Sequence, residues 1–194
     1  MFKAFKLFMA IGIFVFGIFP PIMGDDSEIP NPGADQSAVV FLRPSSYGGK
    51  LWVGLYEVNG ENQNEFIALL RGKQKAVFYV KPGEHLFMAY HKESADFIKA
   101  NLLPGKTYHV LVRPSWASPY MQLSPIHRAG LDLAKHTDLV LQCQLVDKTS
   151  KEGWAADPKT ISRVEKMRGK FYKNWISSKE ATSLAHSILA EDGF

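Results

Sequence analysis

The amino-acid sequence predicts a mainly β protein, an antiparallel β-sandwich followed by a C-terminal pair of α-helices. About eight short runs rich in β-branched and aromatic residues recur every ~8–12 residues, and clusters of turn residues separate them. No long amphipathic helix interrupts these runs, which argues against a parallel sheet with crossover helices. After residue 157, apolar residues recur at three- and four-residue intervals, which predicts helix.

The composition suits one globular domain. The chain has 194 residues, of which 46% are hydrophobic and 22% are charged, so a substantial core can form. The net charge is +4, and Lys3 and Lys6 lie in the extreme N-terminus. No run of Lys or Arg has the density of a nucleic-acid patch. We therefore expect no nucleic-acid partner, and at most a weak preference for an anionic envelope surface or another envelope protein.

The first 24 residues have the layout of a secretory signal peptide. A basic start precedes an apolar stretch of thirteen residues, Leu7 to Phe19, and Pro20 and Pro21 follow it. A membrane-spanning helix needs ~20 apolar residues, so the two prolines end this stretch too early.

Cleavage of the signal would leave an exported protein, periplasmic or associated with the envelope. Residues 25–37 would then form a flexible tether, because they are rich in Pro, Gly and Asp and show no periodicity. The alternative is an uncleaved inner-membrane anchor formed by residues 7–19, because Gly24 alone fits the small-residue pattern of a cleavage site.

Cys143 is the only cysteine of the chain. No intramolecular disulfide can form, and no cysteine near the signal can carry a lipid anchor. Along residues 139–146, leucines and Cys143 alternate with positions that include two glutamines, which predicts a thiol that faces the core. We expect Cys143 to be buried and inert rather than a catalytic nucleophile.

The sandwich domain is expected at residues 38–147, with a helical segment at residues 148–194 packed on it. The predicted strands are, in order, Ala38–Arg43, Lys50–Val58, Glu65–Leu70, Gln74–Val80, Glu84–His91, Ser94–Leu102, Lys106–Pro114 and Pro119–Ile126. Residues 128–138 are compatible with a loop or a short helix. Residues 139–147 are predicted as a final extended run.

Two helices are predicted in the C-terminal segment. Asp157 fits an N-cap and Pro158 the first helical position. The apolar stripe of this helix consists of Ile161, Val164, Met167, Phe171, Trp175 and Ile176. Such a stripe most simply docks on the chain's own sheet, and a partner helix or a membrane surface is the alternative. The second helix is predicted from Ser177, which fits a capping box with Glu180, to Gly193.

The histidines raise the question of a metal or catalytic site. In the predicted strand Glu84–His91, His85 and His91 share one face, and Leu86 and Met88 lie on the other, which we expect to be the core face. At ~3.3 Å per residue the two imidazoles stand ~20 Å apart, too far to share one metal ion. We therefore expect surface or edge histidines, with no metal site and no cofactor.

No catalytic constellation is found in the sequence. The Gly-Lys-Thr sequence at residues 105–107 resembles the end of a phosphate-binding loop, but Ala100 stands where that motif needs glycine. Glu93 and Asp96 are close in the sequence, and solvated charge is the simplest interpretation of both.

Three short motifs carry a resemblance to a known family. They are Arg43-Pro44, Pro82-Gly83-x-His85 and Pro104-Gly105-Lys106-x-Tyr108. In these motifs, over about residues 38 to 114, the chain resembles the bacterial family called domain of unknown function 2846. The resemblance implies an envelope-located sandwich of immunoglobulin-like shape, with no established activity and no catalytic residues. Many members of that family are lipoproteins, and this chain departs from them because it lacks a cysteine near the signal.

We therefore expect an exported, non-enzymatic envelope protein that binds or scaffolds another component. Arg113, Trp116 and Tyr120 form the best candidate contact loop, and a hydrophobic lid over the sandwich end is the alternative role for this loop. A hydrolase of cell-wall or glycan material, with acids such as Glu93 and Asp96, remains an alternative function, as does a membrane-tethered structural protein. A hydrolase would bring ionisable side chains within ~5–10 Å of one another in a cleft.

Overall fold

The computed structural model describes residues 29, 31–45, 50–60, 63–114, 121–147 and 152–194. The predicted signal peptide therefore lies outside the described residues. The end of the predicted tether is held on the domain, because the Gln36 carbonyl accepts a hydrogen bond of 2.7 Å from the Gly105 amide. The first strand starts at Ser37, one residue before its predicted start.

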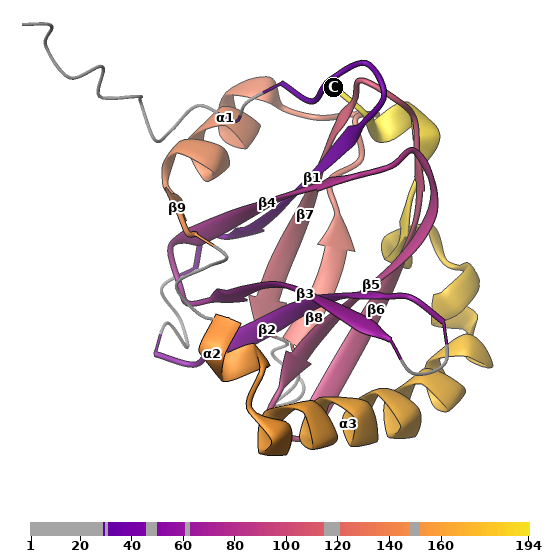
Figure 1. Cartoon of the computed structure of the whole chain (residues 1–194). Coiled ribbons are helices and arrows are strands. Elements are labelled where there is room, and N and C mark those ends of the chain that lie inside the picture. The colour runs from indigo at the N-terminus through magenta and orange to yellow at the C-terminus, as the bar shows by residue number, and fades with distance from the viewer. Residues whose placement is uncertain (1–28, 30, 46–49, 61–62, 115–120, 148–151) are drawn as a thin grey trace, which may run out of the picture.

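Two five-stranded sheets make up the body of the described chain (Figure 1). The first, which we call the β1 sheet, has the order β8 (Met121–Pro125), β7 (Thr107–Pro114), β1 (Ser37–Arg43), β4 (Gln74–Val80) and β9 (Gln144–Leu145). The second, the β5 sheet, has the order β10 (Ser187–Ile188), β6 (Ser94–Leu102), β5 (Gly83–His91), β2 (Val53–Val58) and β3 (Asn64–Leu70). All eight strands predicted before residue 127 overlap observed strands.

Both sheets are mixed, so the expectation of purely antiparallel pairing is wrong. β1 pairs in parallel with β7, β4 with β9, and β10 with β6. The parallel β1–β7 pair is possible because several intervening strands form most of the other sheet before the chain returns, and so supply the long connection that parallel neighbours need.

The main core lies between the two sheets. Phe41 of β1 and Phe87 of β5 meet edge to face with ring centroids 5.5 Å apart, and Phe78 of β4 also contacts Phe87. Edge-to-face pairs of this kind add to the free energy gained from burial alone. The aromatic contacts therefore join the β1 sheet to the β5 sheet.

The predicted core face of β5 is wrong. Phe87 and Ala89, on the same face as His85 and His91, belong to the core between the sheets. Met88, on the opposite face, packs beneath a helix. Both faces of this strand are buried, so alternation alone could not identify the inward face.

The helix α3 (Pro158–Ile176) covers the outer face of the β5 sheet (Figure 1). Asp157 caps it as predicted, because its side chain accepts a hydrogen bond of 2.9 Å from the Thr160 amide. Trp175 contacts Phe97 of β6 with ring centroids 5.5 Å apart. Four residues of the predicted stripe pack against the sheet in this way, namely Val164, Met167, Phe171 and Trp175. The other two, Ile161 and Ile176, are 43% and 49% exposed, so the stripe docks only in part.

A short helix, α2 (Glu152–Ala155), precedes α3, and its Trp154 contacts Phe66 of β3 in the β5 sheet. Gly54 of β2 makes room for it, since a Cβ atom at this position would lie 3.1 Å from the Trp154 ring and 2.9 Å from the Tyr56 ring. The absence of a side chain on Gly54 therefore permits the close approach of α2.

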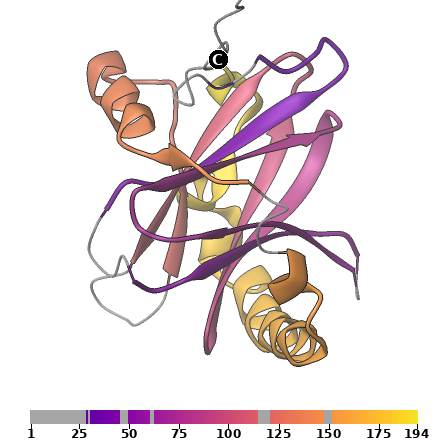
Figure 2. The ribbon, with the colours of Figure 1, turned by 60° about the vertical axis from the view of Figure 1, so that its left-hand side comes forward.

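The helix α1 (Leu133–Leu141) lies on the side of the strands opposite to α3, as Figure 2 shows from a second direction. Residues 128–138 thus contribute to a helix. The predicted extended run at 139–147 is wrong, because its first residues end this helix and only β9 is extended. Cys143 is 3% exposed and packs against Val40 and Leu42, as expected of a buried thiol, and burial raises its pKa.

The predicted second C-terminal helix is also wrong. Ser177 is the C-cap of α3, and the chain beyond it forms three 3₁₀ turns and β10; the turns are Lys179–Thr182, Leu184–His186 and Ala190–Asp192. The Ser183 hydroxyl oxygen accepts a hydrogen bond from the Ala185 amide, and the Ser187 hydroxyl donates to the Ser183 carbonyl. Such local serine bonds compete with a regular helix. None of the helices in the described part of the chain is long and apolar enough to cross a membrane.

Candidate functional site

A groove lies between the C-terminal half of α3 and the part of the β5 sheet where β5 begins and β6 ends. Its volume is about 1120 Å³, whereas small-molecule sites usually measure ~300–1,000 Å³. Its walls come from β2, β5, β6, β10 and α3, so segments far apart in the sequence meet in it. We call it the α3 groove.

The sheet wall of the groove combines apolar and charged side chains. In the register of β5 and β6, Leu86 lies opposite Lys99 and Glu84 lies opposite Asn101, so these four residues share the outer face of two neighbouring strands. Lys99 is exposed, and its Nζ lies 5.7 Å from the centroid of the Trp175 ring. This wall therefore places a cation beside an aromatic and an aliphatic surface.

The helix wall is one side of α3. Its residues are Arg168, Gly169, Tyr172, Lys173 and Ile176. Arg168 is buried, and its Nη1 donates a hydrogen bond of 2.9 Å to the Gly60 carbonyl. A Cβ atom added to Gly169 would meet no atom within 4 Å outside its own helix backbone. The guanidinium thus fixes α3 to the turn after β2, while Gly169 leaves the groove open.

Glu57 and His85 form a mostly buried pair that lines the groove. The His85 Nδ1 lies 2.5 Å from Glu57 Oε1, and its Nε2 lies 2.8 Å from the Lys81 carbonyl oxygen. Each ring nitrogen of His85 therefore faces an oxygen atom at hydrogen-bond distance. Because both ring nitrogens are engaged, this pair ties β2 to β5 and leaves no nitrogen open to a substrate.

The third wall of the groove is β10 with the residue after it, Leu189. Ser187 and Ile188 pair in parallel with Lys99 and Ala100 of β6. Ile188 is 2% exposed and belongs to the core between the sheets. One short strand thus joins the wall of the groove to the main core.

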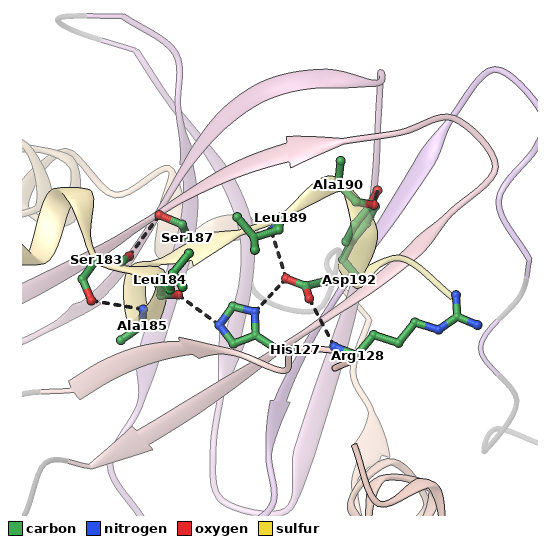
Figure 3. Close-up of polar contacts among 10 residues, drawn as sticks. His127, Arg128, Ser183, Leu184, Ala185, Ser187, Leu189, Ala190 and Asp192 are labelled. Atoms are coloured by element: carbon green, nitrogen blue, oxygen red, sulfur yellow. Dashed lines mark hydrogen bonds and ion pairs between the residues drawn. The ribbon is translucent and has the colours of Figure 1, made fainter. Parts of the chain in front are cut away.

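Asp192 holds this wall in place (Figure 3). Its carboxylate accepts hydrogen bonds from His127 Nδ1 at 2.8 Å, from the Leu189 amide at 2.9 Å and from the Arg128 amide at 3.1 Å. His127 Nε2 lies 3.0 Å from the Leu184 carbonyl oxygen. Asp192 is 3% exposed. Both nitrogens of this second imidazole face acceptors as well, so His127 fastens the tail rather than serving as an open base.

Phe194 fastens the tail at a second point. It exchanges two backbone hydrogen bonds with Thr107, of 3.0 and 3.2 Å, and its ring stacks on His136 at 5.0 Å. His109 meets the His136 ring edge to face at 4.5 Å. Burial, with smaller contributions from the neighbouring His136 and Lys75, lowers the pKa of His109 to about 3. His109 is therefore a neutral packing residue at ordinary pH.

Of the three residues predicted to form a contact loop, the structure describes Arg113. Arg113 is exposed on β7, and its Nη2 donates a hydrogen bond of 2.9 Å to the Ser124 hydroxyl. Trp116 and Tyr120 lie outside the described residues. Arg113 does not line the α3 groove.

The two acids of the alternative hydrolase have different surroundings. Glu93 is exposed in the turn between β5 and β6. Asp96 accepts a hydrogen bond of 2.7 Å from the Leu123 amide and lies 3.8 Å from His186 Nε2, so its interpretation as solvated charge is wrong. Within the described ranges, no three His, Cys, Asp or Glu side chains are arranged to hold a metal ion.

No family model matches the chain, and a search of curated proteins finds no match to it. The resemblance to the family called domain of unknown function 2846 therefore stays a prediction. The structure itself shows a mainly β protein with two mixed sheets and an open groove beneath a helix.

Sequence reasoning missed the residues of the groove. Lys99 lies in the predicted strand Ser94–Leu102 and Lys173 in the helix predicted after Asp157, and neither was singled out as a candidate site residue. A usable signal was present, because a helix that docks by an apolar stripe leaves the residues at the border of that stripe close to the sheet. The sequence alone could not say which strands lie beneath that border.

Proposed function

We propose that this protein is an exported, non-enzymatic binding module of the bacterial cell envelope that holds its ligand in the α3 groove. The observation that carries the proposal is the groove itself, a volume of about 1120 Å³ with both apolar and charged walls. Binding sites are usually concave, largely preformed and lined in this mixed way.

The support for a binding module comes from how the groove is built. Its sheet wall is tied by the Glu57–His85 pair, its helix wall by the bond from Arg168 to the Gly60 carbonyl, and its tail wall by Asp192. Walls fixed in this way bind with little ordering cost. The engaged nitrogens of His85 and His127 favour binding over acid–base chemistry at these residues.

The envelope location rests on the layout of the first 24 residues. The packing of two sheets through Phe41 and Phe87 supports an immunoglobulin-like module of the type that the resemblance to domain of unknown function 2846 implies. Rigid two-layer β scaffolds commonly carry binding surfaces in many unrelated proteins.

Occupancy of the groove can be tested with two substitutions at one position. Gly169→Trp should fill the groove, whereas Gly169→Ala should leave it open, because a Cβ atom at this position meets no neighbour. The full chain of each variant would be expressed with its own N-terminus, extracted gently from the envelope fraction and weighed by native mass spectrometry. We expect a bound molecule in the wild type and in Gly169→Ala, and none in Gly169→Trp.

An equal amount of bound molecule in both variants would contradict the proposed site. Absence of any bound molecule from all three proteins would contradict the proposed function. Recovery of the protein from the cytosolic fraction would contradict the envelope location.

A further inference from the structure

Two exposed lysines line the α3 groove from different walls. Lys99 belongs to β6 and Lys173 to α3. Neither forms an ion pair with a carboxylate of the described residues. The groove also contains Glu84, which is exposed, and Glu57, whose side chain is only 7% exposed and bonded to His85. The exposed charge of the groove is therefore predominantly positive.

Apolar surface lies beside these lysines. Leu86 and Tyr172 are partly exposed in the groove, and the Ile176 side chain, at the end of the helix wall, is 49% exposed. An apolar chain that replaces water on this surface binds favourably, because apolar area is removed from water. The groove thus offers cations and a hydrophobic track in one place.

We propose that the occupant of the α3 groove is an anionic amphiphile, a single apolar chain that ends in an acidic head group such as a phosphate. This inference rests on the proposed function and specifies its ligand. The Lys99 and Lys173 ammonium groups donate hydrogen bonds to the head group, and the chain lies on Leu86, Tyr172 and Ile176.

Charge and shape together select this class of ligand. A neutral chain would cover the groove and leave the ammonium groups of Lys99 and Lys173 with fewer water partners, which is unfavourable. A free inorganic anion would leave the apolar track exposed to water. A cationic chain would meet two like charges, with Glu84 as its one exposed counterion.

The test uses the purified full chain, freed of bound lipid, and three probes below their micelle concentrations. The probes are dodecyl phosphate, dodecyl maltoside and inorganic phosphate, titrated by calorimetry. We expect dodecyl phosphate to bind one molecule per chain, at least ~10-fold more tightly than dodecyl maltoside, since a hydrogen bond to a charged group contributes about this factor. It should also bind at least ~10-fold more tightly than inorganic phosphate, because its chain covers the apolar surface of the groove. Added salt should weaken it, because exposed charges are screened.

Matched variants assign the binding to the groove. Lys99→Gln and Lys173→Gln should each weaken the binding of dodecyl phosphate ~10-fold and leave the binding of dodecyl maltoside unchanged. Lys166→Gln, at an exposed position of the same helix outside the groove, should change neither. Gly169→Trp should abolish binding of both amphiphiles, and Gly169→Ala should not.

The inference and the proposed function fail in different ways. Equal binding of dodecyl phosphate and dodecyl maltoside, both blocked by Gly169→Trp, would overturn the anionic ligand and keep the groove as a binding site. Inorganic phosphate that binds as tightly as dodecyl phosphate would overturn the apolar chain. If no probe binds while envelope-extracted protein still carries a molecule that Gly169→Trp removes, the inference falls and the proposed function stands.

Discussion

His109 shows how burial makes one residue sensitive to acid. It is 5% exposed, and its pKa is lowered from 6.5 to about 3, first by burial and then by His136 and Lys75. Between these pH values the unfolded chain binds a proton that the folded chain does not. The contribution of neutral His109 to the free energy of unfolding is therefore fully present above pH 6.5. It is lost as the pH falls toward 3, by at most ~1.4 kcal/mol per pH unit.

Replacement of this imidazole should flatten the acid dependence. In His109→Phe the ring contacts with His136 and Phe194 are kept, but the proton site is gone. We expect the slope of unfolding free energy between pH 7 and pH 5 to fall by up to ~1.4 kcal/mol per pH unit, measured by urea unfolding at several pH values. An unchanged slope would mean that His109 does not titrate in this way.

Gly193 is a second residue whose role follows from its surroundings. A Cβ atom at this position would lie 2.8 Å from Lys106 Cβ and 2.9 Å from Tyr108 Cζ, and Tyr108 is fully buried. Gly193→Ala should therefore destabilise the fold by ~1–3 kcal/mol through overpacking. Thermal unfolding of the variant checks this, and a melting temperature equal to that of the wild type would contradict the close approach.

At the scale of elements, α3 contains one glycine whose replacement should raise the stability of the protein. Gly169 lies inside the helix at a position where a Cβ atom meets no neighbour. Gly169→Ala should stabilise the protein by ~0.5–1 kcal/mol, because glycine loses more backbone entropy than alanine. In a chain of this size that gain is a rise of ~1–4 °C in melting temperature. A lower melting temperature of Gly169→Ala would contradict the open space around this position.

The tail depends on Asp192. Asp192→Asn removes the charge that faces His127 and replaces one acceptor with a donor beside the Leu189 and Arg128 amides. We expect a loss of ~1–3 kcal/mol and faster hydrogen exchange in Ser187–Leu189. Glu191→Gln, at the exposed neighbouring position, is the control and should change neither quantity. Equal effects of the two substitutions would contradict the role of Asp192 in holding the tail.

The strands could be predicted from the sequence because their signals are local. Alternation and turn residues define each strand in its own ten or so residues, and the Asp157 cap with its following proline defines the start of α3 in the same way. The prediction of a second C-terminal helix was wrong because serine side chains at 183 and 187 bond to nearby backbone. These bonds break a pattern that looks helical.

The site could not be predicted because it depends on long-range pairing. The prediction of which face of β5 points into the core was wrong because α3 buries the second face as well. Lys99 and Lys173 line the same groove only because α3 docks on β6. A single sequence carries the periodicity of each element but not the choice of the strand on which a helix rests.

At the scale of the whole molecule, two sheets form one core and α3 adds a further layer. Phe41 and Phe87 join the sheets, while Trp175 joins α3 to Phe97 of β6. The α3 groove opens where this added layer diverges from the sheet, and the tail closes its side through β10. Fold and site are therefore linked, since the helix that completes the packing also forms a wall of the groove.

Photo-crosslinking in living cells tests occupancy of the α3 groove most directly. A photo-reactive residue would replace Ile176, which lines the groove and is 49% exposed, or Ile161, which is 43% exposed on the same helix outside it. We predict that an adduct with a molecule other than the protein forms at position 176 alone and disappears with Gly169→Trp. Adducts at neither position, or equally at both, would contradict a ligand in the groove.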